Sequence, residues 1–157
     1  MQKNKFYTVN EATKILEYFC AYQERCHKEV ENKLTELRMI PEAKEQIILH
    51  LLENNFLNEE RFAKAFVRGK FNFKKWGKIK IKNELKFRNI SSYNIKVSLK
   101  EIDDDLYQET IQEVAQKKVN LIREPNSFKK KQKLIKYLLS KGYESEFVYK
   151  IANELIE

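Results

Sequence analysis

The sequence predicts an all-α protein, built as an elongated, curved array of three tandem three-helix repeats. The 157 residues include only three glycines and two prolines, too few turn residues for a many-stranded sheet. Apolar residues recur at three- and four-residue spacing along the chain, which is the period of a helix. A long helix followed by two shorter ones is expected three times, at a period of roughly 50 residues.

The first repeat is expected over residues 1–57. Thr8 and Glu11 are spaced as a capping box, in which each side chain bonds the backbone amide of the other residue, so a helix should begin there. Pro41 suits the first turn of the third helix of this repeat. The expected inward stripes are Ala12, Ile15, Leu16, Phe19 and Cys20, then Val30, Leu34 and Leu37, then Ile47, Ile48, Leu51 and Leu52.

The second repeat is expected over residues 58–102 and the third over residues 103–157. Asn58 and Ser91 are candidate N-caps, and Gly77 precedes the helix between them. The acidic run at Asp103 favours the start of the next long helix, because carboxylates stabilise helix N-termini. The inward residues are Phe62, Ala63, Phe66 and Val67, then Ile81, Leu85 and Arg88, then Ile95 and Leu99, then Ile111, Val114, Ala115 and Val119, then Leu134, Ile135 and Leu138, then Phe147, Val148 and Ile151.

Four-residue apolar steps recur at corresponding places in the three repeats. They join Val30 to Leu34, Ile81 to Leu85, and Ile135 to Leu139. Any amphipathic helix contains such steps, so a chance resemblance between helices is the alternative to true repetition. True repeats that contact mainly their neighbours produce an extended body with a long face for a large partner. An array with polar ends is expected to be a monomer.

Enzymatic, exported and membrane-spanning proteins are poor matches to this sequence. The N-terminal residues have no apolar signal region, and no apolar run approaches the roughly 18 residues that span a bilayer. Cys20 and Cys26 match no common zinc spacing and should be reduced, either packed or inert on the surface. His27 and His50 have no nucleophile or ligand partners nearby in the sequence. We therefore expect a cytoplasmic protein that is not an enzyme and needs no cofactor and no metal.

Positive charge is concentrated in the middle of the chain. The formal net charge is +8 overall, and residues 58–102 alone have 13 basic and 4 acidic side chains. Residues 1–57 have 8 basic and 9 acidic side chains, and residues 103–157 have 10 of each. Such an asymmetry is typical of a surface that binds a polyanion.

The basic side chains of the middle repeat fall into rows at helical spacing. Arg61, Lys64 and Arg68 form one row, and Lys78, Lys82 and Lys86 form another, each opposite an apolar stripe. Two such rows on adjacent helices can line a groove for phosphates. The candidate contact residues are Arg61, Lys64, Arg68, Lys70, Lys74, Lys75, Trp76, Lys78, Lys82 and Lys86.

Three alternatives remain open for these side chains. The lysines can form an ordinary solvated face, or they can pair with an acidic protein surface. Phe71, Phe73 and Trp76 can stack on bases, although aromatic residues beside a turn are more often packing residues. A second basic patch at Lys129–Lys131, with Lys133 and Lys136, is considered weaker because the third repeat is neutral overall.

Three segments resemble the signature of a known family. They are Leu57-Asn58-Glu59-Glu60-Arg61-Phe62-Ala63, Trp76-Gly77-Lys78-Ile79-Lys80-Ile81, and Glu84-Leu85. They resemble the RecX family, small regulators of the RecA recombinase, most specifically over residues 56–90 and more loosely over the whole chain. Asn58 replaces a usual acidic residue, and Phe87-Arg88-Asn89-Ile90 replaces a more usual Lys-Gly-Ile turn, which makes the geometry of this turn an open question.

The resemblance implies a non-catalytic protein that lies in the deep groove of the RecA–single-stranded-DNA filament. Such a protein contacts neighbouring protomers and limits ATP hydrolysis, strand exchange and co-protease activity, in DNA recombination, DNA repair and the SOS response. The positions that match the family are Arg61, Phe62, Trp76, Gly77, Ile81 and Leu85, of which Phe62, Ile81 and Leu85 are assigned to folding.

Two competing functions remain. One is a general DNA-binding helical-repeat protein that follows single- or double-stranded backbone without a dedicated protein partner. The other is a helical scaffold that binds an acidic protein and no nucleic acid.

Overall fold

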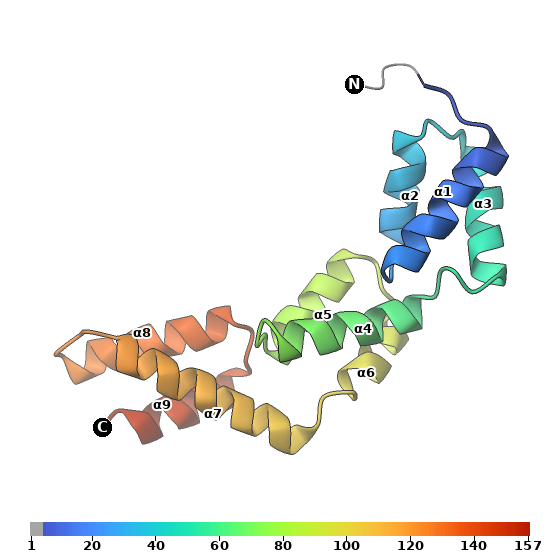
Figure 1. Ribbon diagram of the computed structural model, residues 1–157. Helices are drawn as coiled ribbons and strands as arrows, with labels where there is room; N and C mark the ends of the chain where they lie inside the picture. Colours follow the sequence, from blue (N-terminus) through green and yellow to red (C-terminus); the bar gives the residue numbers. More distant parts are fainter. Residues whose placement is uncertain (1–4) are drawn as a thin grey trace.

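The computed structural model describes residues 5–157, and these residues form nine helices and no strand (Figure 1). Residues 1–4, which contribute to the expected absence of an export signal, lie outside the described part. The helices are α1 (Val9–Tyr22), α2 (His27–Glu36), α3 (Pro41–Glu53), α4 (Glu59–Asn72), α5 (Lys78–Phe87), α6 (Ser92–Leu99), α7 (Asp104–Leu121), α8 (Ser127–Ser140) and α9 (Ser145–Leu155). Helices pack mainly within the triplets α1–α3, α4–α6 and α7–α9. The predicted all-α array is confirmed.

The triplets follow one another along a curved path (Figure 1). The second and third triplets lie end to end, and the first rises from one end of this row. No helix among residues 5–157 is long and apolar enough to cross a membrane.

Helix starts are determined by local sequence, as predicted. The Thr8 hydroxyl accepts from the Glu11 amide at 3.1 Å, and the Glu11 carboxylate accepts from the Thr8 amide at 2.9 Å. The side chains of Asn58, Ser91 and Asp103 likewise accept from the amide three residues on. Pro41 occupies the first turn of α3. Each cap satisfies an amide that has no partner within its helix.

The predicted inward residues are buried or partly buried, with two exceptions. Leu52 is 41% exposed and Leu139 is 40% exposed. In α8, Leu134, Ile135 and Leu138 are buried and Leu139 is not, so the buried four-residue step joins Leu134 to Leu138, one residue before the step predicted at Ile135 and Leu139. Consecutive residues on a helix point about 100° apart, so this shift turns Leu139 from the core toward solvent.

The repeats share a turn that fixes their register. Arg38, Asn89 and Gly142 each have a left-handed backbone, with φ of 62°, 60° and 95°. Each stands four residues after a fully buried leucine, and the leucine carbonyl accepts from the amide that follows the turn residue. The amides of Met39, Ile90 and Tyr143 donate to Leu34, Leu85 and Leu138 at 3.1, 3.1 and 3.4 Å. Asn89 thus adopts the left-handed conformation that the family's glycine usually provides.

The buried apolar residues form two separate clusters. One belongs to the first triplet and includes Leu16, Leu34 and Leu51. The other runs through the second and third triplets, from Ile81 and Leu85 to residues of α7–α9, and it also includes Cys26 at the start of α2. The second and third triplets therefore share one core.

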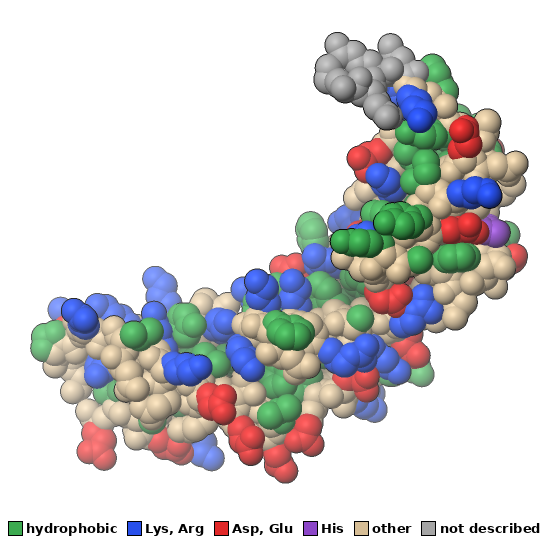
Figure 2. Space-filling view, in the orientation of Figure 1, with side chains coloured by type: hydrophobic (Ala, Val, Ile, Leu, Met, Phe, Trp, Pro, Cys, Tyr) green, Lys and Arg blue, Asp and Glu red, His purple; other side chains and the backbone are tan. Residues whose placement is uncertain are grey.

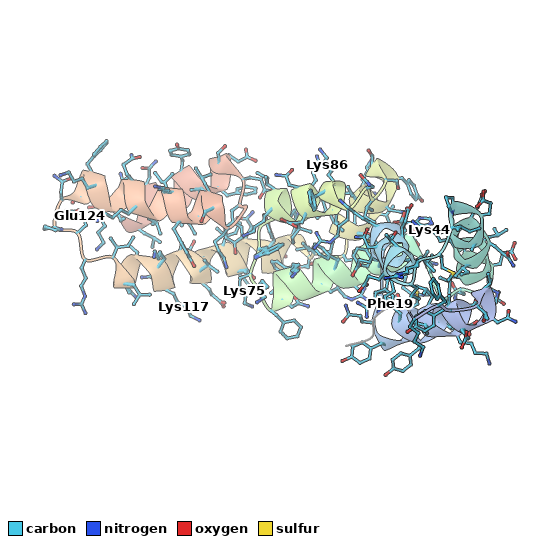
Figure 3. All side chains as sticks on the ribbon, turned by 90° about the horizontal axis from the view of Figure 1, so that it is seen from above. Phe19, Lys44, Lys75, Lys86, Lys117 and Glu124 are labelled. Atoms are coloured by element: carbon cyan, nitrogen blue, oxygen red, sulfur yellow. The ribbon has the colours of Figure 1, made fainter. Side chains whose placement is uncertain are left out.

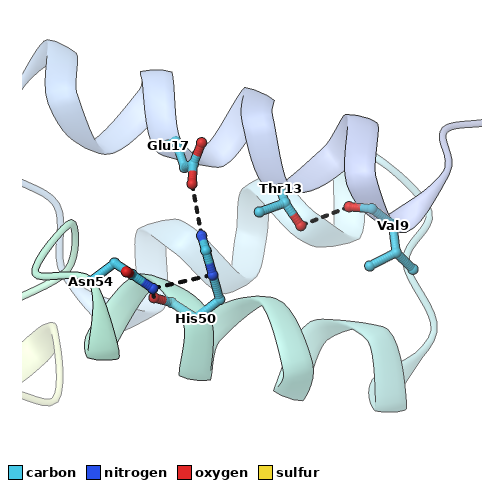
Figure 4. Close-up of polar contacts among 5 residues, drawn as sticks. All are labelled: Val9, Thr13, Glu17, His50 and Asn54. Carbon is cyan, nitrogen blue, oxygen red and sulfur yellow. Dashed lines mark hydrogen bonds and ion pairs between the residues drawn. The ribbon is translucent and has the colours of Figure 1, made fainter.

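The two histidines hold helices together. His50 Nε2 lies 2.7 Å from Glu17 Oε2 and joins α3 to α1, while Asn54 contacts His50 Nδ1 at 3.2 Å (Figure 4). The His27 amide donates to Glu59 at 3.1 Å, across the boundary between the first two triplets. Both cysteines are free and buried. Within residues 5–157, no cluster of histidine, cysteine and carboxylate side chains has the arrangement of a metal site.

Candidate nucleic-acid interface

The loop between α4 and α5 is fixed by backbone contacts with the third triplet. The Gly77 amide donates to the Lys141 carbonyl at 2.7 Å, and the Ile79 amide donates to the Gly142 carbonyl at 3.0 Å. A Cβ atom on Gly77 would lie 2.2 Å from the Gly142 carbonyl carbon. Only glycine therefore allows the two chains to approach this closely.

Two buried tyrosines complete this junction. The Tyr107 hydroxyl accepts from the Lys78 amide at 2.9 Å and donates to Glu144. The Tyr143 hydroxyl donates to the Lys75 carbonyl. Burial raises the pKa of both phenols, and the Glu144 carboxylate raises the pKa of Tyr107 further. The neutral phenols hold the lysine-bearing loop in one position.

Trp76 is packed into a cluster of aromatic and cationic side chains. Its half-buried ring meets Phe66 edge-on, with the centroids 6.4 Å apart. The ammonium groups of Lys70 and Lys80 lie 4.8 and 4.5 Å from the Trp76 ring, within the range of cation–π attraction. Phe71 is buried, whereas Phe73 is 85% exposed. Of the three aromatic residues at this turn, Phe73 has the most accessible ring.

Four of the predicted contact residues have carboxylate partners within the protein. Lys64 lies 3.7 Å from Glu60, Arg68 lies 3.1 Å from Glu101, and Lys78 lies 3.6 Å from Asp104.

Of these four residues, Arg61 has the most partners within the protein. It pairs with Glu24 and donates to the carbonyls of Asn55 and Phe56 at 3.0 and 3.2 Å. Its guanidinium therefore ties α4 to the first triplet. Because these four residues already pair with carboxylates, other lysines of the middle triplet are the ones free to bind an external anion.

Those lysines are Lys74, Lys75, Lys82 and Lys86, which are exposed. In the described chain, no carboxylate lies within 4 Å of their ammonium groups. Figure 3 separates Lys86, on the α5 side of the molecule, from Lys75, which follows the end of α4. The predicted cations thus occupy more than one side of the middle triplet.

The structure adds three lysines that the sequence-based set omits. Lys80 contacts Trp76, and Lys28 reaches from the first triplet to the Phe87 ring at 4.1 Å and to the Phe87 carbonyl at 3.1 Å. Lys141 donates to the Lys74 carbonyl at 2.7 Å. Lys141 precedes Gly142, so an alignment of the repeats by their turns would place it opposite Arg88 and would have drawn attention to it.

Family models and relatives agree with this architecture. Residues 58–99 match the model for the second three-helix domain of RecX, and residues 104–151 match that for the third. Regulatory protein RecX of Clostridium perfringens is 31% identical over 133 residues, which are 83% of this chain and 62% of that protein. The corresponding protein of Yersinia enterocolitica is 30% identical over 117 residues, with coverages of 74% and 68%. The chain thus spans less than two thirds of the clostridial relative and slightly more than two thirds of the Yersinia one.

Solved structures of the same fold extend the match over nearly the whole chain. The crystal structure of RecX from Lactobacillus salivarius superposes with a TM-score of 0.81 at 26% identity, and covers 94% of this chain and 96% of its own. A second crystal structure of a regulatory protein RecX has a TM-score of 0.80 at 20% identity and shows the shared fold. The repeated turns, the tryptophan–glycine junction and these similarities together establish that the chain belongs to the RecX family.

Proposed function

We propose that this protein regulates the RecA recombinase, mainly as an inhibitor. It binds in the groove of the RecA–single-stranded-DNA filament and limits ATP hydrolysis, strand exchange and co-protease activity. It acts in the cytoplasm as a monomer, without a catalytic step, cofactor or metal of its own. Membership of the RecX family supports a regulatory role of this kind.

The observation that carries this proposal is the combination of a curved array with unpaired lysines on its middle triplet. Lys74, Lys75, Lys82 and Lys86 are exposed and have no carboxylate partner among the described residues. A filament of recombinase on DNA is strongly anionic. Binding of these cations to the filament is therefore electrostatically favourable. A body several repeats long can contact more than one protomer.

The direct test is the ATPase activity of RecA from the same host on single-stranded DNA, measured while this protein is titrated in. Hydrolysis should fall with added protein and saturate. Undiminished hydrolysis at saturating protein, with binding to the filament confirmed by co-sedimentation, would contradict inhibition.

A charge-reversed pair tests the assigned surface. Lys82→Glu with Lys86→Glu changes two exposed residues one helical turn apart on α5, and lysine and glutamate have similar helix propensities. Inhibition should weaken while helical circular dichroism is unchanged. The matched control is Lys14→Glu with Lys150→Glu, which changes the net charge equally on α1 and α9. Equal loss in both variants would show that only total charge matters.

A general DNA-binding protein is the competing function, because the same lysines can neutralise phosphates of naked DNA. Binding to single- or double-stranded DNA without RecA distinguishes the two functions. DNA binding that is as tight without the recombinase as with it, combined with unaltered ATPase activity, would favour this competitor.

A further inference from the structure

The third triplet is neutral as a whole, but its charges are segregated in space. Its ten basic and ten acidic side chains cancel in the sequence. In Figure 2, lysine and arginine gather on the upper part of the arm that holds α7 and α8, and acidic side chains gather along its lower edge. A net charge of zero therefore conceals a strongly basic face.

Two adjoining grooves lie between α7, α8 and the α4–α5 loop. Their volumes are about 330 and 470 Å³, and they share Lys118, Leu121 and Tyr137 as walls. Lys75, Lys117 and Lys141 line the first groove, and Arg123, Lys133 and Lys136 line the second. We call the two together the α7–α8 groove. Figure 3 shows Lys75 and Lys117 on the same side of the molecule.

The cations of the α7–α8 groove outnumber its carboxylates. Glu113 is the acidic residue that lines it, against seven lysine and arginine residues. Lys133 pairs with Glu124 at 3.2 Å, and the Lys118 ammonium lies 4.5 Å from the centre of the Tyr137 ring. Lys75, Lys117 and Lys136 are exposed, and no described carboxylate lies within 4 Å of them. An anionic ligand would neutralise this excess.

Lys141 connects the α7–α8 groove to the middle triplet. Burial lowers the pKa of its ammonium, and the nearby charges of Lys80 and Lys74 lower it further. Lys80 in turn contacts Trp76. Like charges held this close repel one another, and bound phosphate would relieve the repulsion. A continuous band of cations therefore runs from the Trp76 cluster, past Lys141, to α8.

We propose that the α7–α8 groove is a binding site for the phosphate backbone of single-stranded nucleic acid. Adjacent packed helices have axes about 8–10 Å apart, so a groove between them accepts one strand more readily than a duplex. Lys117 on α7 and Lys136 on α8 line the groove without a carboxylate partner among the described residues, and both can contact phosphates. Leu121, which is 73% exposed, and the half-buried Tyr137 provide an apolar floor for sugars and bases. The α7–α8 groove shares Lys75 with the surface proposed to bind the RecA filament, but its binding of naked strands can be tested without RecA.

The test is the affinity of the full chain for labelled oligothymidine, measured by fluorescence anisotropy over a series of salt concentrations without RecA. The variant is Lys75→Asn with Lys117→Gln and Lys136→Gln, because asparagine tolerates the left-handed backbone of residue 75. Each lost phosphate contact on a single strand reduces the slope of log affinity against log salt by about 0.7, so the slope should fall by about two units.

The matched control is Lys14→Gln with Lys100→Gln and Lys150→Gln, three exposed lysines outside the α7–α8 groove. It should keep nearly the wild-type slope. An unchanged slope in the groove variant, or equal losses in both variants, would overturn the assignment. Competition by polyglutamate as effective as that by the oligonucleotide, at equal charge, would also overturn it in favour of an acidic protein ligand. Since no recombinase is present, these outcomes say nothing for or against inhibition of RecA.

Discussion

Two glycines of the second triplet have opposite roles in this protein. Gly69 lies within α4, and a Cβ atom added to it would meet no other atom within 4 Å. Gly77 lies at the junction of the second and third triplets, where an added Cβ would collide with the backbone of residues 142 and 143. Backbone atoms cannot move aside as a flexible side chain can, so substitution at these two positions has opposite consequences.

We expect Gly69→Ala to raise the free energy of unfolding by about 1 kcal/mol, because alanine favours a helix interior over glycine by that amount. Gly77→Ala should lower it by at least about 2 kcal/mol, because the overpacked junction must separate. Urea denaturation followed by circular dichroism measures both changes. The same sign of change in the two variants would contradict the described junction.

The buried Cys20 thiol should make the free energy of unfolding decrease with rising pH in the alkaline range. Burial raises its pKa from 9.0 to about 11 in the folded protein. Between these two values the unfolded chain loses the proton and the folded chain keeps it, so the unfolded state gains stability as pH rises. Burial likewise raises the pKa of Tyr107 and Tyr143, which acts in the same direction above about pH 10.

The free energy of unfolding should therefore be level just below pH 9 and decline between pH 9 and about 11. Denaturant titrations at successive pH values measure the decline, and alkylation by iodoacetamide shows when the thiol becomes reactive. Rapid alkylation of Cys20 in the folded protein near pH 9 would contradict the raised pKa.

At the scale of the helix, local signals were enough to predict most helix starts. Thr8, Asn58 and Ser91 cap their helices because a cap involves only residues three positions apart. The inward face of α8 was less predictable. Leu134, Ile135, Leu138 and Leu139 permit two stripes one residue apart, and the choice between them is made by packing against α7 and α9.

Glycine substitutions in the repeated turn should stabilise the protein by different amounts. Arg38 has φ of 62°, and a non-glycine residue pays roughly 1–2 kcal/mol for this conformation, so Arg38→Gly should stabilise the protein by about 1 kcal/mol. Asn89→Gly should give a smaller gain, because asparagine tolerates the left-handed region. Thermal unfolding of the two variants measures the order. A larger gain at Asn89 than at Arg38 would be evidence against a common turn.

At the scale of the molecule, the first triplet has a core of its own, and Cys26 at the start of α2 is its one residue buried in the core of the other two triplets, among the residues described. Other contacts that link it to the second triplet are the pair Glu24–Arg61, the contact of His27 with Glu59, and Lys28 over the Phe87 ring. The other two triplets share a continuous apolar core. Sequence periodicity predicted the three triplets, but it did not predict that the second and third share one core while the first has its own. That difference depends on contacts between residues distant in sequence, such as Phe71 with Tyr107.

Hydrogen exchange should therefore reveal two cooperative units. Amides of α1–α3 should exchange together, and amides of α4–α9 should exchange together at a different rate. Leu16→Ala removes a fully buried side chain from the first core and should accelerate exchange mainly in α1–α3. Mass spectrometry of peptides from each helix makes the comparison. Equal acceleration throughout the chain would indicate one cooperative unit.

Charge accounting along the sequence found the basic middle triplet, but it ranked the patch at Lys129–Lys131, Lys133 and Lys136 as weaker because the third triplet is neutral overall. A count over residues 103–157 sums to zero because it ignores which side of the helices each charge occupies. Lys75, Lys117 and Lys141 come together from three separate elements, and only the folded chain brings them to one groove.

The segregation of charge in the third triplet also acts before any contact forms. A neutral body with cations on one side and carboxylates on the other has an electric dipole, and a polyanion exerts a torque on it from beyond contact distance. The molecule therefore turns its lysine-bearing side toward the polyanion during diffusion, and a larger share of collisions arrives in a productive orientation. Added salt screens this torque within about 10 Å at 0.1 M, so the association rate constant should fall with ionic strength.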